Sequence, residues 1–164
     1  MKTVYFVRHA KSSWKDLTLR DKDRPLNKRG KRDAPFMANL MKEKGIQVDA
    51  IISSPANRAY TTACHFATAL GVEELSIHKE EDIYEAYDTA VLKIIQELPN
   101  NYDTIFVFGH NPSFTSLANL FTTDYIDNVP TCGIVHVAAS IEDWKNFGEN
   151  TGKLIAFHYP KQYF

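Results

Sequence analysis

The stretch Val4-Tyr5-Phe6-Val7-Arg8-His9-Ala10 decides the fold, because it joins a short apolar run directly to an arginine and a histidine. A continuous run of β-branched and aromatic residues is typical of a strand that is buried on both faces of a sheet. In sheets covered by helices on both faces, ligands bind at the carboxyl ends of the strands. Arg8 and His9 therefore stand where a functional site is expected.

Composition predicts a globular protein. The chain has 164 residues, of which 44% are hydrophobic, and we expect one domain over residues 1–164. Its apolar runs are shorter than the roughly 18 to 20 residues of a membrane helix, and the first is shorter than the roughly 7 to 15 apolar residues of a signal peptide. We therefore expect a cytoplasmic protein. Cys64 and Cys132 are too isolated to form a zinc or disulfide framework, and we expect them to be buried.

Charge is unevenly distributed along the chain. Residues 1–44 hold 13 Lys and Arg against 5 Asp and Glu, whereas the remainder holds 6 against 15. The positive portion suits a phosphate-bearing partner, although the same residues also fit the solvated face of a helix. The basic stripe with interleaved aromatic residues that is typical of nucleic-acid surfaces does not occur. We therefore expect neither a nucleic acid nor a membrane as partner.

Two further apolar runs end in polar residues. Residues 48–52 lead into Ser53-Ser54-Pro55, and residues 104–108 lead into Gly109-His110-Asn111-Pro112. A polar residue followed by proline predicts a helix start, with the residue before each proline as the N-cap. Arg58 then falls in the first turn of a helix that follows a strand directly.

The rest of the chain alternates between helical and strand patterns. Residues 11–26 show no periodicity and predict a long loop, which in a compact domain is often functional. Asn27 predicts the cap of the next helix, but Pro35 indicates either a kink or a later start with Asp33 as the cap. A helix is also expected over residues 90–98, and strands are expected over residues 75–78, 134–138 and 154–157. This alternation predicts a three-layer α/β/α sandwich around a mostly parallel mixed sheet of about six strands.

Parallel strands would bring the three polar ends to one edge of the sheet. Two arginines and two histidines would meet there, namely Arg8, His9, Arg58 and His110. Guanidinium groups match phosphate oxygens and helix N-termini add partial positive charge, so this edge suits a tetrahedral dianion. Neither GxGxxG nor GxxxxGK[ST] occurs, which excludes the usual dinucleotide and P-loop sites. A metal held by the two histidines stays open, although the arginines would repel a cation and no carboxylate cluster accompanies them. The other histidines are expected to be structural: His65, His78, His136 and His158.

Together with Arg24-Pro25-Leu26, these motifs resemble the histidine phosphatase superfamily over nearly the whole chain. Their order and spacing resemble its SixA-like phosphohistidine phosphatase branch, which implies a phosphoglycerate mutase-like fold. One departure is Ala10, because many relatives have glycine after the Arg-His pair; alanine should fit unless the position needs a positive φ. Larger relatives insert a helical cap over the site. The short separation between Arg58 and Glu85 leaves little room for it, so no large cap subdomain is expected.

The resemblance also implies roles for individual residues. His9 would be the nucleophile that forms a phosphohistidine intermediate, while Arg8, Arg58 and His110 would hold the transferring oxygens, His110 best as a cation. Glu85 is the candidate proton donor for an ester leaving group. Further candidates for substrate binding are Ser12 and Arg24. This mechanism requires no metal or other cofactor.

An open site would admit a phosphorylated side chain that stands on a protein surface. We therefore expect the substrate to be phosphohistidine on a protein partner, such as a histidine-containing phosphotransfer domain. Two alternatives stay open. The protein could be a phosphatase for small phosphoesters or a sugar phosphate, or it could be a non-catalytic phosphate-binding module.

Overall fold

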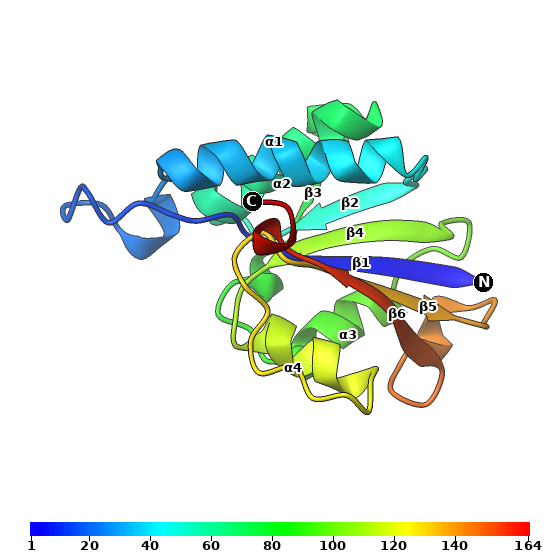
Figure 1. The fold of residues 1–164 in the computed structure, drawn as a ribbon. Coiled ribbons are helices and arrows are strands. Elements are labelled where there is room, and N and C mark those ends of the chain that lie inside the picture. Colours follow the sequence, from blue (N-terminus) through cyan, green and yellow to red (C-terminus); the bar gives the residue numbers. More distant parts are fainter.

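Six strands form one mixed sheet in the order β3-β2-β4-β1-β5-β6 (Figure 1). The computed structural model describes residues 1–164. The strands are β1 (Lys2–Arg8), β2 (Ala50–Ser53), β3 (His78–Lys79), β4 (Thr104–Gly109), β5 (Ile134–Ala139) and β6 (Gly152–His158). The first four strands run parallel, whereas β5 is antiparallel to both β1 and β6. The predicted mixed and mostly parallel sheet is therefore confirmed.

Helices cover both faces of the sheet (Figure 1). One face packs against α1 (Lys28–Glu43) and α2 (Asn57–Leu70), and the other packs against α3 (Asp88–Gln96) and α4 (Ser113–Leu120). Along β1, Val4 and Phe6 join the core on the α3 and α4 side, while Tyr5 and Val7 join the core on the α1 and α2 side. Because successive side chains of a strand alternate between faces, burial on both sides explains the continuous apolar run. No helix combines the length and the apolar composition that crossing a membrane requires.

The start of α2 differs from the prediction. The helix begins at Asn57 with Ala56 at its N-cap, so Ser54 is not the cap. The Ser54 hydroxyl instead accepts a hydrogen bond from the backbone N–H of Ala56 at 3.2 Å, and it also contacts the ring of His110. The residue is therefore used at the functional edge of the sheet and not at the helix terminus.

The start of α4 is also later than predicted. Pro112, rather than Asn111, occupies its N-cap, and the bond between these two residues is cis. The amide oxygen of Asn111 still accepts a hydrogen bond from the backbone N–H of Thr115 at 3.1 Å. Asn111 thus satisfies a free N–H group of the first turn from a position one residue before the cap.

Two other boundaries depend on local contacts. Asn27 caps α1 as predicted, accepting from the backbone N–H of Gly30 at 2.9 Å, and the helix continues through Pro35 without a later start at Asp33. The third strand is shorter than predicted, because residues 74–76 form a 3-10 turn and only His78–Lys79 pair with β2. This short strand lies at an edge of the sheet.

The parallel register aligns the strand ends that carry the functional candidates. Arg8 at the end of β1 pairs with Gly109 at the end of β4, and Ser53 at the end of β2 pairs with Phe108. These ends point to the same edge of the sheet, where the chain between β1 and α1 extends outward (Figure 1). The residues that follow these strands are therefore held at one level by the sheet.

Candidate active site

A cavity of about 190 Å³ lies at this edge of the sheet. Its lining contains six of the seven candidates proposed from the sequence: Arg8, His9, Ser12, Arg24, Arg58 and His110. The ring centroids of His9 and His110 are 5.2 Å apart. Parallel pairing of β1, β2 and β4 therefore gathers these side chains around one space, as the alignment of their strand ends predicted.

The imidazole of His9 is held in one tautomer. Its Nδ1 atom lies 2.7 Å from the carbonyl oxygen of Ala10. A carbonyl oxygen only accepts hydrogen bonds, so Nδ1 carries the proton. Burial lowers the pKa of His9 to about 3, and the neighbouring His110, Arg58 and Arg8 act in the same direction. The ring is therefore neutral at pH 7, with its lone pair on Nε2, which is the form that a nucleophilic imidazole needs.

Ala10 fits its position directly after Arg8 and His9. Its side chain is fully buried, and its backbone N–H donates to the hydroxyl oxygen of Thr62 at 3.0 Å. The only non-glycine residues with positive φ are Glu85 and Cys132, so Ala10 has an ordinary backbone conformation. An alanine at this position therefore carries no conformational strain.

The ring of His110 is oriented by Ser54. Its Nε2 atom lies 2.8 Å from Ser54 Oγ, which already accepts the backbone N–H of Ala56. Ser54 is fully buried and Nε2 is the only acceptor that its hydroxyl contacts, so the hydroxyl donates to Nε2 and the proton of a neutral His110 is on Nδ1. Burial and the nearby Arg58 lower the pKa of His110 to about 4. The protein groups around His110 therefore favour a neutral ring that donates from Nδ1, and a cationic His110 with a phosphoryl group bound stays a prediction.

Three buried nitrogen atoms around the cavity have no hydrogen-bond partner in the protein: Arg8 Nε, Arg58 Nε and His110 Nδ1. No other buried side-chain nitrogen or oxygen atom in the chain lacks a partner. An unpaired buried donor costs roughly 1 to 3 kcal/mol, so a fold seldom keeps several of them together without a use. All three belong to residues that line the cavity with His9, and such a set of donors suits a tetrahedral anion.

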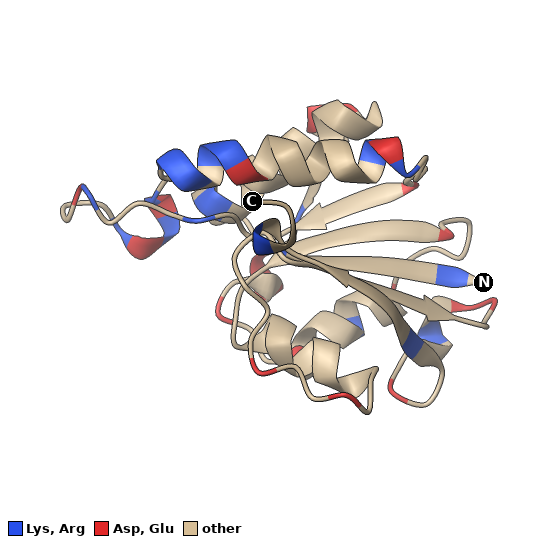
Figure 2. Cartoon of the chain, viewed as in Figure 1, with Lys and Arg blue, Asp and Glu red and all other residues tan.

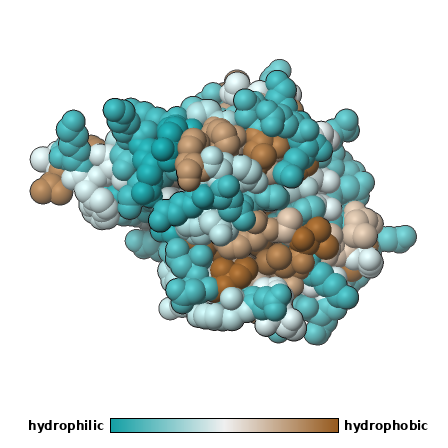
Figure 3. Space-filling model, viewed as in Figure 1, coloured by the Kyte–Doolittle hydropathy of each residue, from teal (hydrophilic) through white to brown (hydrophobic).

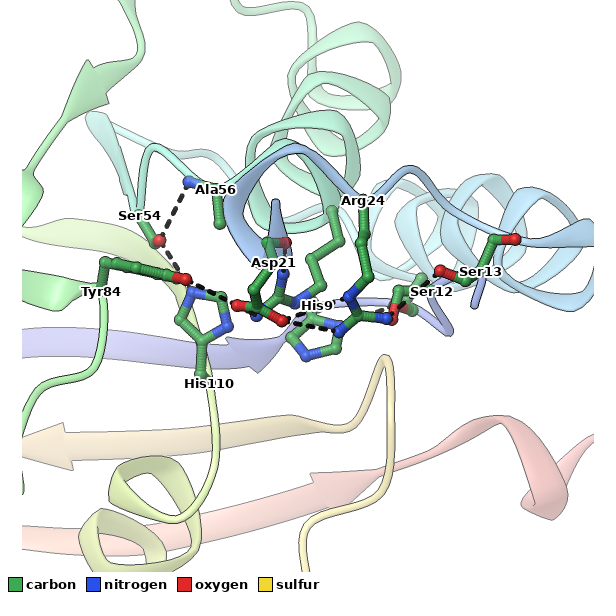
Figure 4. Close-up of polar contacts among 11 residues, drawn as sticks. His9, Ser12, Ser13, Asp21, Arg24, Ser54, Ala56, Tyr84 and His110 are labelled. Atoms are coloured by element: carbon green, nitrogen blue, oxygen red, sulfur yellow. Dashed lines mark hydrogen bonds and ion pairs between the residues drawn. The ribbon is translucent and has the colours of Figure 1, made fainter. Parts of the chain in front are cut away.

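Asp21, which the sequence analysis did not single out, connects the basic residues to Tyr84 (Figure 4). Its carboxylate accepts from the Tyr84 hydroxyl at 2.6 Å and from Arg58 Nη2 at 3.0 Å, and it pairs with Arg24 Nη2 at 3.1 Å. These contacts, with that of Tyr84 the strongest, lower the pKa of Asp21 to about 2. Burial and the same carboxylate raise the pKa of Tyr84 to about 12. Asp21 lies in the loop over residues 11–26, which has no periodic pattern. Its position three residues before Arg24 is the only sequence signal that could have indicated this ion pair.

Arg24 and Ser12 form part of the cavity wall. Arg24 Nη1 donates to Ser12 Oγ at 2.8 Å, and the guanidinium lies 3.5 Å from the ring centroid of Trp14. Arg24 also pairs with Asp21, so its guanidinium links Ser12 in the cavity wall to this carboxylate. Both residues therefore border the space beside His9, and their part in substrate binding stays a prediction.

Glu85 does not share this space. It is exposed and lines a separate cavity with Tyr87 and Lys93 on the α3 side. The backbone at Glu85 is left-handed, with φ of 55°. The preceding residue, Tyr84, is the one that faces the site, where its ring lies 5.6 Å from that of His110. The geometry thus does not support Glu85 as a proton donor next to His9.

The remaining histidines and cysteines lie outside the cavity. His136 stacks on Tyr5 with ring centroids 4.4 Å apart, in keeping with a packing role. Cys132 is buried, whereas Cys64 is only half-buried, so the prediction of burial holds for one of the two thiols. Nowhere in the chain do three or more His, Cys, Asp or Glu side chains gather in a way that could hold a metal ion.

Comparisons with known proteins agree with this geometry. A model of the histidine phosphatase superfamily (branch 1) matches residues 4–106, which include Arg8, His9 and Arg58. An uncharacterised protein of Mycobacterium tuberculosis is 30% identical over 94% of this chain and 100% of its own length.

Solved structures share the whole fold. A SixA protein of Agrobacterium tumefaciens is 27% identical and superposes with a TM-score of 0.79 over 97% of this chain and 98% of its own. The protein histidine phosphatase SixA complexed with tungstate superposes with a TM-score of 0.82 at 21% identity, covering 98% of each chain. The chain therefore belongs to branch 1 of the histidine phosphatase superfamily and is a SixA-like phosphatase.

Proposed function

We propose that this phosphatase hydrolyses phosphohistidine on a protein partner, through a phosphohistidine intermediate on His9 and without a metal ion. The observation that carries the proposal is the state of His9: a neutral ring with its Nδ1–H donated to Ala10, beside three buried nitrogen atoms that lack acceptors. The oxygens of a phosphoryl group would supply these acceptors. Positive charge and hydrogen-bond donors placed in advance provide most of the catalysis in phosphoryl transfer.

In the first step, the lone pair of His9 Nε2 attacks phosphorus, and the P–N bond to the substrate imidazole breaks. A substrate ring that is protonated on its other nitrogen leaves as neutral imidazole with the electron pair of that bond. His9 becomes a phosphoimidazolium, and its Nδ1–H remains bonded to the carbonyl oxygen of Ala10 at 2.7 Å. This hydrogen bond to a cationic ring is stronger than one to a neutral ring.

In the second step, water attacks phosphorus from the side opposite Nε2. The P–Nε2 bond breaks and its electron pair returns to His9, which is again neutral with its proton on Nδ1. The proton lost by the water passes to the phosphate product or to solvent. Arg8, Arg58 and His110 keep their donors on the phosphoryl oxygens in both steps, so the same cavity stabilises both transition states.

The state of the nearby acids favours an imidazole leaving group over an alkoxide. An alkoxide needs a proton from a general acid. Asp21, the carboxylate that reaches the basic cluster, has a pKa of about 2, and its oxygens accept bonds from Tyr84, Arg24 and Arg58. It is thus ionised at neutral pH. Departure of a protonated phosphohistidine ring requires no such donor.

Trapping the intermediate tests the proposal. A phosphorylated histidine-containing phosphotransfer domain should lose its phosphate, and rapid acid-free quenching should show an acid-labile label on His9. His9→Ala should abolish both signals, whereas His78→Ala, at an exposed histidine of the edge strand, should retain them. Addition of EDTA should leave the rate unchanged.

Other outcomes would identify the alternatives. Fast turnover of one small phosphoester with no action on phosphohistidine would replace the protein substrate with a metabolite. Binding of phosphate without any label on His9 would indicate a non-catalytic module.

A further inference from the structure

We infer that a groove beside the active site binds an acidic protein surface that flanks the phosphorylated side chain. This inference rests on the proposed function, because it concerns where the partner in that reaction docks. The groove has a volume of about 660 Å³ and lies between the loop after β1 and the start of α1. We call it the lysine groove, and its charged lining residues are Lys15, Asp16, Lys28 and Lys31.

The three lysines of the groove make no ion pair or buried contact that would stabilise the fold. All are exposed, and none forms an ion pair. Lys28 and Lys31 lie in the first turns of α1, where the positive end of the helix dipole disfavours cations, and the first turn contains no acidic residue. Figure 2 shows Lys and Arg gathered at this end of α1, next to the loop. An anionic partner that binds here would offset the unfavourable interaction between these lysines and the helix dipole.

A thin wall separates the lysine groove from the active-site cavity. The segment after β1 is extended and pairs with the chain before α1 through a bridge between Ser12 and Leu26. Ser12 and Trp14 line the cavity, whereas Ser13 and Lys15 line the groove on the other side of the segment. A partner whose phosphorylated side chain enters the cavity would therefore place its neighbouring residues over the wall, within reach of the lysines.

The same loop offers apolar contacts. Trp14 and Leu17 have 64% and 84% of their surface exposed, respectively. The guanidinium of Arg24 lies 3.5 Å from the ring centroid of Trp14 and holds that ring in place. Figure 3 shows apolar atoms at the tip of this loop, apart from the larger apolar areas of the surface. Tryptophan and arginine are the residues that most often contribute strongly to protein interfaces.

Charge complementarity identifies the occupant as an acidic protein surface. Ammonium groups attract carboxylates without requiring a fixed geometry, and unpaired cations at the rim of an interface increase the rate of association. A single-stranded nucleic acid would need several aromatic faces for base stacking, but one face of Trp14 is covered by Arg24 and no aromatic residue lines the groove. Apolar loop residues next to a basic groove thus favour a protein over a nucleic acid.

Two matched phosphohistidine peptides test the inference. One carries Asp and Glu around the phosphohistidine, and the other carries Asn and Gln at the same positions; phosphoimidazole serves as a substrate without flanking residues. Wild-type protein should prefer the acidic peptide by about tenfold in kcat/KM, as expected for a few exposed charge pairs, and mainly through KM. Added salt should reduce this preference.

Charge reversal in the groove should remove the preference. In Lys15→Glu/Lys28→Glu/Lys31→Glu, kcat/KM for the acidic peptide should fall to or below that for the neutral peptide, while turnover of phosphoimidazole stays unchanged. The matched control changes the same number of exposed lysines elsewhere: Lys42→Glu/Lys44→Glu/Lys153→Glu. This control should keep the preference for the acidic peptide.

The experiment separates failure of docking from failure of catalysis. Equal kcat/KM for both peptides in the wild type, or an unchanged preference in the groove variant, overturns the inference even when phosphoimidazole is hydrolysed. If no substrate is hydrolysed, the proposed function fails, and calorimetric binding of the two peptides to His9→Ala still measures the charge preference. Tighter binding of an oligonucleotide than of the acidic peptide to the groove would also overturn the assignment.

Discussion

The Nε2 atom of His110 lies 2.8 Å from the hydroxyl oxygen of Ser54, two residues that are 56 positions apart in the chain. Ser54 is fully buried and its hydroxyl contacts no other acceptor, so its proton is donated to the ring. The contact thereby places the proton of His110 on Nδ1, a buried atom with no partner in the protein. A neutral histidine can bind a phosphoryl oxygen only in this tautomer, so Ser54 acts as a positioning residue for His110.

Replacing Ser54 by alanine should disturb the tautomer of His110 and reduce kcat/KM by about 5- to 10-fold, as expected for one lost hydrogen bond of roughly 1 kcal/mol. The ¹⁵N chemical shifts of the His110 ring report the tautomer directly. Ser53→Ala is the matched control, because the buried Ser53 hydroxyl donates to the Ser54 carbonyl oxygen at 2.9 Å and does not contact His110. An unchanged His110 tautomer in Ser54→Ala would contradict the assigned role.

The two active-site histidines should stay neutral well below the usual histidine range. Their pKa values of about 3 for His9 and about 4 for His110 predict neutral ring signals in NMR spectra at pH 5.5. Below pH 6.5 the unfolded chain takes up protons on these two histidines, whereas the folded chain does not. The free energy of unfolding is therefore highest above pH 6.5 and decreases as the pH falls from 6.5 through these pKa values. A protonated ring at pH 6 would contradict the prediction.

The lowered pKa values of both histidines also make the stability of the protein depend on pH. In urea titrations, the free energy of unfolding of the wild type should decrease between pH 6.5 and pH 4.5. His110→Asn should lose less over this interval, because asparagine has no proton to take up on unfolding. His78→Ala should follow the wild type, since this side chain is exposed.

Asp21→Asn should lower the pKa of Tyr84 from about 12 toward the ordinary value of 10. Burial raises the pKa of Tyr84 most, and the Asp21 carboxylate adds to the shift because it accepts a hydrogen bond from the Tyr84 hydroxyl at 2.6 Å; an amide oxygen accepts this bond more weakly. The measurement is a spectrophotometric tyrosine titration, with Tyr84→Phe used to identify the relevant step. Asp23→Asn is the matched control in the same turn, because Asp23 pairs with Arg20 at 2.8 Å. Equal Tyr84 titration in both Asp variants would rule out this coupling.

Gly30→Ala should destabilise the protein and impair the site together. A Cβ at Gly30 would collide with the carbonyl oxygen of Lys11, two residues after the proposed nucleophile. Moving this segment should cost about 1 to 3 kcal/mol in the free energy of unfolding and should also lower kcat. Gly148→Ala, where no atom lies within 4 Å of the new Cβ, should leave both quantities nearly unchanged. Chemical denaturation and steady-state kinetics on the two variants provide the comparison.

Some of the site could be predicted because it depends on local sequence. A strand buried on both faces selects a continuous run of apolar residues, which marks β1, β2 and β4 without knowledge of their neighbours. The residues just after these runs are then at one edge of a parallel sheet. Arg8, His9 and His110 could be placed in this way, and Arg58 could be placed from the helix that follows β2.

Other features could not be predicted because their cause is a contact between distant segments. The capping prediction for Ser54 was wrong since its hydroxyl is engaged by His110 across two strands. Glu85 was proposed from the family resemblance, but the left-handed backbone at Glu85 accompanies a turn in which Tyr84, and not Glu85, faces the site. These residues lie outside regular helices and strands, where hydrophobic periodicity does not indicate which side chains face the site.

The sequence by itself determined the order of strands and helices, the family resemblance and the group of basic residues at the sheet edge, because burial and helix caps act over a few residues. Only the tertiary structure decided the protonation of His9 and His110, the part played by Asp21 and the lysine groove behind the cavity wall. The physical reason is distance along the chain. Asp21 and Tyr84 are 63 positions apart. Both histidine pKa values are lowered by burial and by the positive charge of arginines that lie on separate elements.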